Sequence, residues 1–124
     1  MEHFLFSQLK ETELPGRAVY KAIGADSFVK STGMTYGRTR FSLDYGPMAP
    51  HHHAEEIIYV LDTKAGIVRW GDTEACTGGT LRLEPGMTLH FPAQEWHVFE
   101  FEQPDGYSEI LFFYGSTTDI RPEK

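Results

Sequence analysis

Apolar and polar residues alternate along much of this chain, and this alternation constrains its fold more than any other feature. Residues 39–45 show the pattern clearly, because Phe41, Leu43 and Tyr45 share one parity and polar residues stand between them. Successive side chains of a β-strand point to opposite faces, so a period of two residues predicts a strand. Helical periodicity is nearly absent, and the chain is therefore expected to be all-β.

Short segments of the same kind recur at intervals of about ten residues, which is the spacing typical of a β-sandwich or barrel. Turn residues, mostly Gly, Pro and Asp, separate them. The first 32 residues are less regular and are compatible with N-terminal strands or a short helix. The other expected strands cover residues 56–61, 66–70, 80–83, 87–91, 96–101 and 108–114.

Composition limits the classes to which the protein can belong. The 124 residues are 40% hydrophobic and 14% aromatic, as in a globular domain, and the net charge of −7 disfavours binding to nucleic acid. The single cysteine, Cys76, excludes an internal disulfide and fits a reducing compartment. No apolar run approaches the length of about 18 residues that spans a bilayer. We therefore expect a cytoplasmic protein with no nucleic-acid partner and no membrane partner.

Three consecutive histidines, His51, His52 and His53, stand directly before an expected strand, and Glu55 and Glu56 follow them. In an extended chain His51 and His53 share one face, while His52 points away. Imidazoles and a carboxylate that converge across a turn can form a metal site, to which a distant strand can add a fourth ligand, with His97 as the candidate; the alternative is that the three histidines belong to a solvated loop. Imidazole suits zinc, copper, iron and nickel, and carboxylate adds tolerance for manganese.

Two motifs in the chain resemble those of the cupin superfamily. The first motif contains a glycine, His-x-His, a glutamate and a second glycine, and residues 46–62 are similar to it. The second contains a glycine, a Pro-Gly turn and a proline turn before a histidine, and residues 79–97 are similar to it. The resemblance extends over residues 37–114 and implies a cupin-type double-stranded β-helix, or jelly-roll barrel. One cupin domain would span residues 1–124, with the barrel core at about 33–116.

The resemblance also implies a set of metal ligands, which are two histidines and a glutamate of the first motif and the histidine of the second. These positions fall on His51, His53, Glu56 and His97. Only two residues separate His53 from Glu56, one fewer than the usual minimum, so His52 and Glu55 remain alternative ligands. We favour Glu56, because the strand that follows matches the family best with the second glutamate as ligand. The chain also departs from the family pattern at Thr63, Gln94 and Phe101.

Four further side chains are candidates for catalytic or substrate-binding roles. Tyr36 carries a phenol that can exchange a proton with a substrate near a metal. Arg38 and Arg40 share one face of a strand, where one of them can bind a substrate carboxylate, or where both simply face solvent. His90 precedes the proline turn and is either a partly buried strand histidine or a pocket residue.

A site of three histidines and one carboxylate leaves about two positions open on an octahedral ion, and open positions mark a catalytic site. The resemblance implies one divalent ion (Fe, Mn, Ni or Zn) and an enzyme acting on a small polar or anionic metabolite. Dioxygenase and lyase or isomerase chemistry are both compatible with it. The alternative is a noncatalytic, metal-stabilised cupin that binds a small molecule. Small cupins commonly pair sheet faces, so we also expect a homodimer.

Overall fold

The computed structural model describes residues 1–120 and consists almost entirely of β-strands, which confirms the all-β prediction. Two short 3₁₀ turns, Phe6–Gln8 and Leu43–Tyr45, interrupt them, and no helix in the described part is long and apolar enough to cross a membrane. The strands are β1 (Glu11–Leu14), β2 (Arg17–Gly24), β3 (Val29–Lys30), β4 (Thr35–Ser42), β5 (Glu56–Lys64), β6 (Gly66–Gly71), β7 (Gly79–Arg82), β8 (Thr88–Phe91), β9 (Trp96–Phe101) and β10 (Tyr107–Tyr114).

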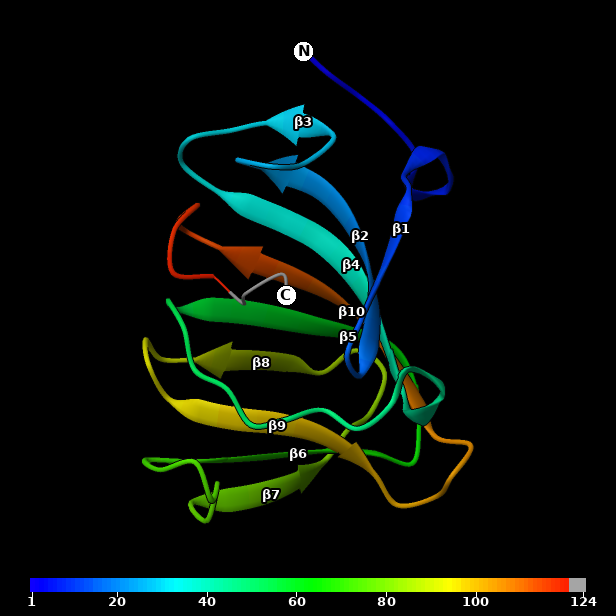
Figure 1. The fold of residues 1–124 in the computed structure, drawn as a ribbon, viewed down its shortest axis with the longest axis vertical. Coiled ribbons are helices and arrows are strands. Elements are labelled where there is room, and N and C mark those ends of the chain that lie inside the picture. Colours follow the sequence, from blue (N-terminus) through cyan, green and yellow to red (C-terminus); the bar gives the residue numbers. More distant parts are fainter. Residues whose placement is uncertain (121–124) are drawn as a thin grey trace.

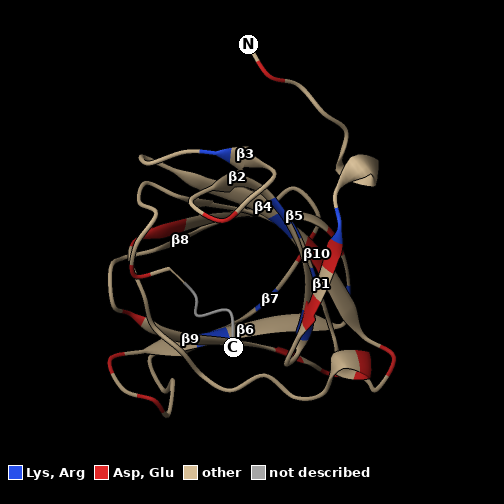
Figure 2. Cartoon of the chain, turned by 45° about the horizontal axis from the view of Figure 1, so that its top comes forward, with Lys and Arg blue, Asp and Glu red and all other residues tan. Residues whose placement is uncertain are grey.

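The strands are arranged in two sheets. The larger sheet has seven strands in the order β1-β2-β4-β10-β5-β8, with β3 beside β2, and the smaller sheet has the order β7-β6-β9 (Figure 1). Strand β10 pairs antiparallel with both β4 and β5, so segments far apart in the sequence become neighbours. Figure 2 looks towards one end of the barrel, with the two sheets facing each other across it.

Four connections carry the chain between the sheets, and two of them bear on the site. Ala65 links β5 of the larger sheet to β6 of the smaller one and adopts a left-handed backbone with φ 57°. Residues 92–95 link β8 to β9, again from one sheet to the other. An isolated antiparallel bridge then joins His51 to His97, with N–H···O distances of 3.0 and 2.9 Å. The segment before β5 is thereby held against the beginning of strand β9.

Alternation decides which residues enter the core between the sheets. Along β5, Ile58 and Val60 are buried, while Ile57, Tyr59 and Leu61 lie on the exposed outer face. Burial of such side chains supplies the main driving force for folding. The buried apolar cluster combines residues of both sheets: Phe41, Ile58, Val60, Val68, Leu83, Leu89, Phe91, Phe99 and Ile110.

The N-terminal region contains strands and one short 3₁₀ turn. Strand β2 pairs with β4, and its residues Ala18 and Ala22 are completely buried. The aromatic residues ahead of β1 pack on the same chain, with Phe6 5.7 Å from Tyr36 and Phe4 5.3 Å from Phe28 between ring centroids. Residues before β4 therefore contribute directly to the larger sheet and place one face of β2 inside the barrel.

Candidate metal centre

The backbone bridge between His51 and His97 brings the two sequence motifs together. Residues that exchange both N–H···O bonds in an antiparallel pair project their side chains to the same face. The rings of His51 and His97 accordingly lie 4.4 Å apart between centroids, and both lie beside the ring of His53. Glu56, the first residue of β5, reaches the same place from the larger sheet.

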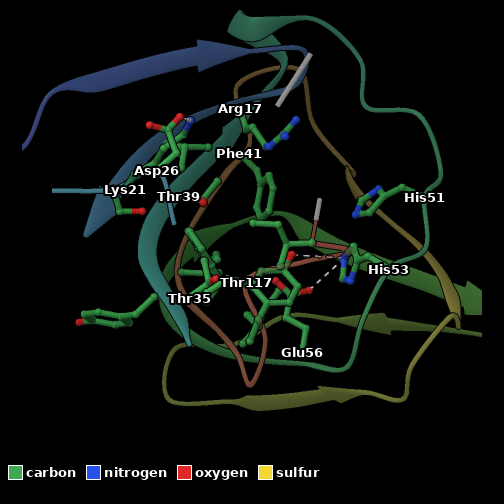
Figure 3. Close-up of a pocket in the computed structure, with 18 of the residues that line it drawn as sticks. Arg17, Lys21, Asp26, Thr35, Thr39, Phe41, His51, His53, Glu56 and Thr117 are labelled. Atoms are coloured by element: carbon green, nitrogen blue, oxygen red, sulfur yellow. Dashed lines mark hydrogen bonds and ion pairs between the residues drawn. The ribbon is translucent and has the colours of Figure 1, made fainter. Parts of the chain in front are cut away.

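The four side chains form a compact and largely buried cluster. One ligand atom from each of His51, His53 and His97 can be chosen so that all lie within 4.8 Å of one another. The Glu56 Oε1 atom lies 3.4 Å from His53 Nε2 and 3.8 Å from His97 Nε2. His53, Glu56 and His97 are 2%, 5% and 1% exposed, respectively. Figure 3 shows Glu56 and His53 directed towards each other.

Main-chain carbonyls orient all three imidazoles. The Nδ1 atoms of His51, His53 and His97 lie 3.2, 2.8 and 2.9 Å from the carbonyl oxygens of residues 49, 54 and 95, respectively. A carbonyl oxygen only accepts hydrogen bonds, so in each ring Nδ1 carries the proton and donates it. The lone pair of a neutral ring then resides on Nε2, which is the arrangement found around protein-bound metals.

The donor set fits a divalent transition metal. Three imidazole nitrogens and one carboxylate oxygen suit zinc, iron, nickel or manganese. The separations of 3.4 and 3.8 Å from Glu56 are close to those between neighbouring ligands of one ion with bonds of about 2.1 Å. In addition, the carboxylate would offset part of the ion's charge in a place where water is scarce.

The two alternative ligands of the sequence analysis have other partners. His52 Nδ1 lies 2.7 Å from Gln94 Oε1, and its ring packs 4.3 Å from the Trp96 ring. Glu55 pairs with His90 at 2.5 Å on the exposed side of the molecule. Neither His52 nor Glu55 is among the clustered side chains, and His90 is not brought to the cluster either. Gln94 has φ 68°, the left-handed conformation that favours the glycine more usual at this turn.

A cavity of about 190 Å³ adjoins the cluster inside the barrel. The cavity is small, so it suits a compact metabolite or one end of a longer molecule. Most of the wall is apolar. The polar groups come from His51, His53 and Glu56, from a few residues of β2, β4 and β10, and from residues 26, 27 and 117 in the connections (Figure 3). The apolar part of the wall consists of Val19, Ala25, Phe41, Met48, Ile58, Phe99, Ile110, Phe112 and Ile120.

The remaining candidates from the sequence lie at the edge of this cavity or outside it. Tyr36 lines the edge and stacks on Phe113 at 4.8 Å, and burial raises the pKa of its phenol. Arg38 and Arg40 both bind the Glu109 carboxylate, at 3.0 and 3.3 Å. Both arginines alternate with the buried residues of β4 and are half-exposed. They therefore face solvent, which is the second of the two alternatives considered from the sequence.

Sequence reasoning missed several polar residues of the cavity, and Arg17 and Tyr114 are the two largest of them. Arg17, the first residue of β2, is 5% exposed and lines the cavity, and its Nη1 donates to the carbonyl of Pro15 at 3.2 Å. Tyr114, the last residue of β10, places its hydroxyl 3.4 Å from His53 Nε2. The alternation of residues along the strands could have indicated both, because Arg17 lies on the same face of β2 as the buried Val19, and Tyr114 lies on the same face of β10 as the buried Ile110.

No protein-family model and no curated protein matches this sequence. Solved structures do match the fold. The polyketide cyclase RemF from Streptomyces resistomycificus has a TM-score of 0.71 at 21% identity, over 99% of this chain and 88% of that one. KdgF from Halomonas sp. has a TM-score of 0.63 at 20% sequence identity, and the match covers 99% of this chain and 96% of that one. A cupin-like protein from Thermotoga maritima has a TM-score of 0.59 at 15% sequence identity, and the match covers 86% of this chain and 72% of that one. At these low identities the similarity is one of fold.

Proposed function

From the small-cupin fold of this chain, we propose that it is a metal-dependent enzyme acting on a small polar or anionic metabolite. In this proposal His51, His53, Glu56 and His97 hold one divalent ion, and the reaction is a lyase or isomerase step that moves a proton. The observation that carries it is the Tyr114 hydroxyl, which lies 3.4 Å from His53 Nε2 within the wall of the cavity. A phenol in that position can give a proton to a substrate or take one from it.

The chain's own residues supply positioning, proton transfer and exclusion of water. A bound divalent ion would polarise a substrate oxygen and stabilise the negative charge that develops when a neighbouring C–H or C–O bond breaks. The carbonyl bonds at Nδ1 keep the three imidazoles from turning. Tyr114 is 5% exposed, so its proton passes to the substrate rather than to bulk water. The apolar wall strengthens each electrostatic interaction by excluding solvent.

Several structures that share the fold are enzymes whose names fit this class of reaction. They include DMSP lyase DddQ from Ruegeria pomeroyi, at a TM-score of 0.66, and oxalate decarboxylase from B. subtilis, also at 0.66. This chain covers 57% of the length of the first protein and 29% of the second. The two enzymes therefore serve as precedents for this class of reaction on the same fold, and their substrates are not assigned to this chain. Fe(II)-HppE, with a TM-score of 0.68, is a precedent for an iron-containing protein with the same fold.

The function is tested by metal analysis combined with a proton-exchange assay. Untagged protein is expected to contain about one divalent ion per chain by elemental analysis. In D₂O it should catalyse metal-dependent C–H exchange or elimination in a panel of small hydroxy and keto acids, followed by NMR. Oxygen consumption with iron but not with zinc would instead identify a dioxygenase. Metal-free protein that binds the same acid with unchanged affinity would identify a noncatalytic binder.

We also propose that the protein is a homodimer that pairs the outer face of the larger sheet. Ile57 and Tyr59 on β5 are 46% and 40% exposed, and Phe113 beside Ile57 on β10 is 38% exposed. An apolar sheet face of this kind favours association with a second copy. Ile57→Glu should weaken dimerisation at least tenfold in sedimentation velocity, whereas Leu81→Glu on the smaller sheet should not. A wild-type monomer at high micromolar concentration would refute the dimer.

A further inference from the structure

Thr39 places a hydroxyl within an apolar part of the cavity wall. It lies near the middle of β4, is 3% exposed and lines the cavity between Arg17 and Thr35 (Figure 3). Its register partners are Val19 on β2 and Ile110 on β10, which are both buried and apolar. Along β4 the neighbours on the same buried face are residues 37 and 41, a glycine and a phenylalanine. All four neighbours on this face therefore lack a polar side chain.

This hydroxyl forms no hydrogen bond with any other residue in the described range 1–120. Four serine and threonine side chains are buried in that range, and Thr39 is one of them. The other three are bonded within the protein: Thr35 donates to a main-chain carbonyl at 2.7 Å, Ser42 accepts from a main-chain amide at 3.1 Å, and Ser108 lies 2.9 Å from the Thr63 hydroxyl. Thr39 is thus the exception among the buried hydroxyls of residues 1–120.

The other polar side chains of the wall are engaged elsewhere or lie in other parts of it. On β2, Arg17 donates to a main-chain carbonyl at 3.2 Å, and Lys21 lies 3.9 Å from Asp26, the second carboxylate of the wall. The polar side chains of residues 27 and 117 belong to the connections. No described hydrogen bond joins any of them to Thr39.

Packing does not account for a threonine at this position. Valine has the same branched shape, suits a strand equally well and carries no polar atom. A hydroxyl that is buried without a hydrogen bond costs free energy, so such a group calls for an explanation. Binding sites commonly set a few polar groups in an apolar wall to orient their ligands. A hydroxyl both donates and accepts, so an oxygen of a ligand in the cavity would satisfy Thr39.

Thr39 and the histidine cluster lie at different levels of the barrel. Tyr114 pairs with Glu56 of the cluster on one side and with Thr35 on the other. Thr39 lies four residues further along β4, a distance of about 13 Å in the direction of the strand. A ligand that reaches both the cluster and Thr39 is therefore an extended molecule with an oxygen at each end.

We infer that Thr39 is a specificity-determining residue that hydrogen-bonds a hydroxyl or keto oxygen at the end of the substrate remote from the histidine cluster. The substrate is then a small organic acid with a second oxygen on its far end. This inference rests on the proposed function, because the acid group would be bound at the metal. An acid with a purely apolar tail leaves the Thr39 hydroxyl without a partner and binds less tightly.

Hydroxy acids matched with their parent acids test the inference. The probes 3-hydroxypropionate, 4-hydroxybutyrate and 5-hydroxypentanoate carry a hydroxyl at different distances from the acid group, and propionate, butyrate and pentanoate lack it. By titration calorimetry, at least one hydroxy acid should bind the metal-loaded wild type about 3- to 30-fold more tightly than its parent acid, as expected for one hydrogen bond to a buried group. Thr39→Val should abolish this preference, whereas Thr39→Ser keeps the hydroxyl and should retain it.

Thermal unfolding separates a role in binding from a structural role. Thr39→Val should melt at or above the wild type, because it removes a hydroxyl that folding buries without a bond to any described residue. Thr63→Val is the matched control, since Thr63 does not line the cavity and its hydroxyl is bonded to that of Ser108. It should melt below the wild type and keep the hydroxy-acid preference. Melting of Thr39→Val clearly below the wild type would give the hydroxyl a structural role and overturn the inference.

Metal analysis distinguishes failure of this inference from failure of the proposed function. Elemental analysis should give equal metal contents for the wild type and Thr39→Val. Metal-free wild type should bind all six acids more weakly but should still prefer the hydroxy acid, a result that stands even if the protein is not a metal-dependent enzyme. An equal preference in the wild type and Thr39→Val, or no preference for any of the three hydroxy acids in either form of the wild type, would overturn the inference.

Discussion

The His97→Ala variant is expected to bind a divalent cation at least about 100-fold more weakly than the wild type. Loss of a group that merely orients a ligand already costs about 10- to 100-fold in metal affinity, and this change removes the ligand itself. His97 is also the member of the cluster that lies in a strand of the smaller sheet, and its backbone bridge to His51 does not depend on its side chain, so the other three groups keep their places. Competition with a chromophoric chelator measures the change directly.

His52→Ala is the matched control, because it removes the neighbouring imidazole that binds Gln94 and packs on Trp96. Its metal affinity should stay within about threefold of the wild type, since the lost ring orients none of the proposed ligands. The His97 ring stacks on Phe91 at 4.0 Å, so His97→Ala also leaves a cavity. Glu56→Gln keeps the volume of its site and should weaken metal binding as well. Equal metal affinity in His52→Ala and His97→Ala would refute the ligand assignment.

The Tyr114→Phe variant is expected to lower kcat by about 10²- to 10⁴-fold while retaining the metal. This range is typical for loss of a group that transfers a proton in the transition state. The substitution removes one oxygen and leaves the ring, which packs edge-on against His53 with centroids 5.1 Å apart. Steady-state kinetics on whichever acid shows exchange, together with elemental analysis of the same preparation, measures both quantities.

Tyr107→Phe provides the comparison for this substitution. Tyr107 also lies on β10, but its hydroxyl donates to Asp62 at 2.9 Å at the exposed side of the sheet. Its loss should change kcat by less than about threefold, because no proton transfer passes through it. If Tyr114→Phe kept full activity with full metal occupancy, the proposal that this phenol transfers a proton would be refuted. A parallel loss of metal would give Tyr114 a role in holding the cluster instead.

The local part of the fold could be predicted from the sequence, because alternation is a property of neighbouring residues. Along β5 the burial alternates residue by residue, as the pattern around Glu56, Ile58 and Val60 predicts. The same reasoning places His51 and His53 on one face with His52 opposite, and the structure shows that arrangement. The jelly-roll expectation came from motif resemblance, and the matching structures confirm that fold.

Parity alone could not say which face of a strand points into the barrel. On β4, Tyr36, Arg38 and Arg40 share one face and Thr35, Thr39 and Phe41 share the other, and both faces mix polar with apolar residues. On β2 an arginine occupies the inner face, where an apolar residue is expected from its burial. For this reason Arg38 and Arg40 were candidates for the site, and Arg17 was not.

The sequence by itself determined the strands, their alternation and the residue types able to hold a metal, since these depend on local backbone geometry and on side-chain chemistry. Tertiary structure decided which strands meet. The His51–His97 bridge joins residues 46 positions apart, and β10 inserts between β4 and β5 through hydrogen bonds that no local pattern encodes. Only this closure brings Arg17 and Tyr114, from opposite ends of the chain, to the cavity beside the histidines. The physical reason is that backbone hydrogen bonds are alike at every residue, so side-chain packing of the whole barrel selects the pairing.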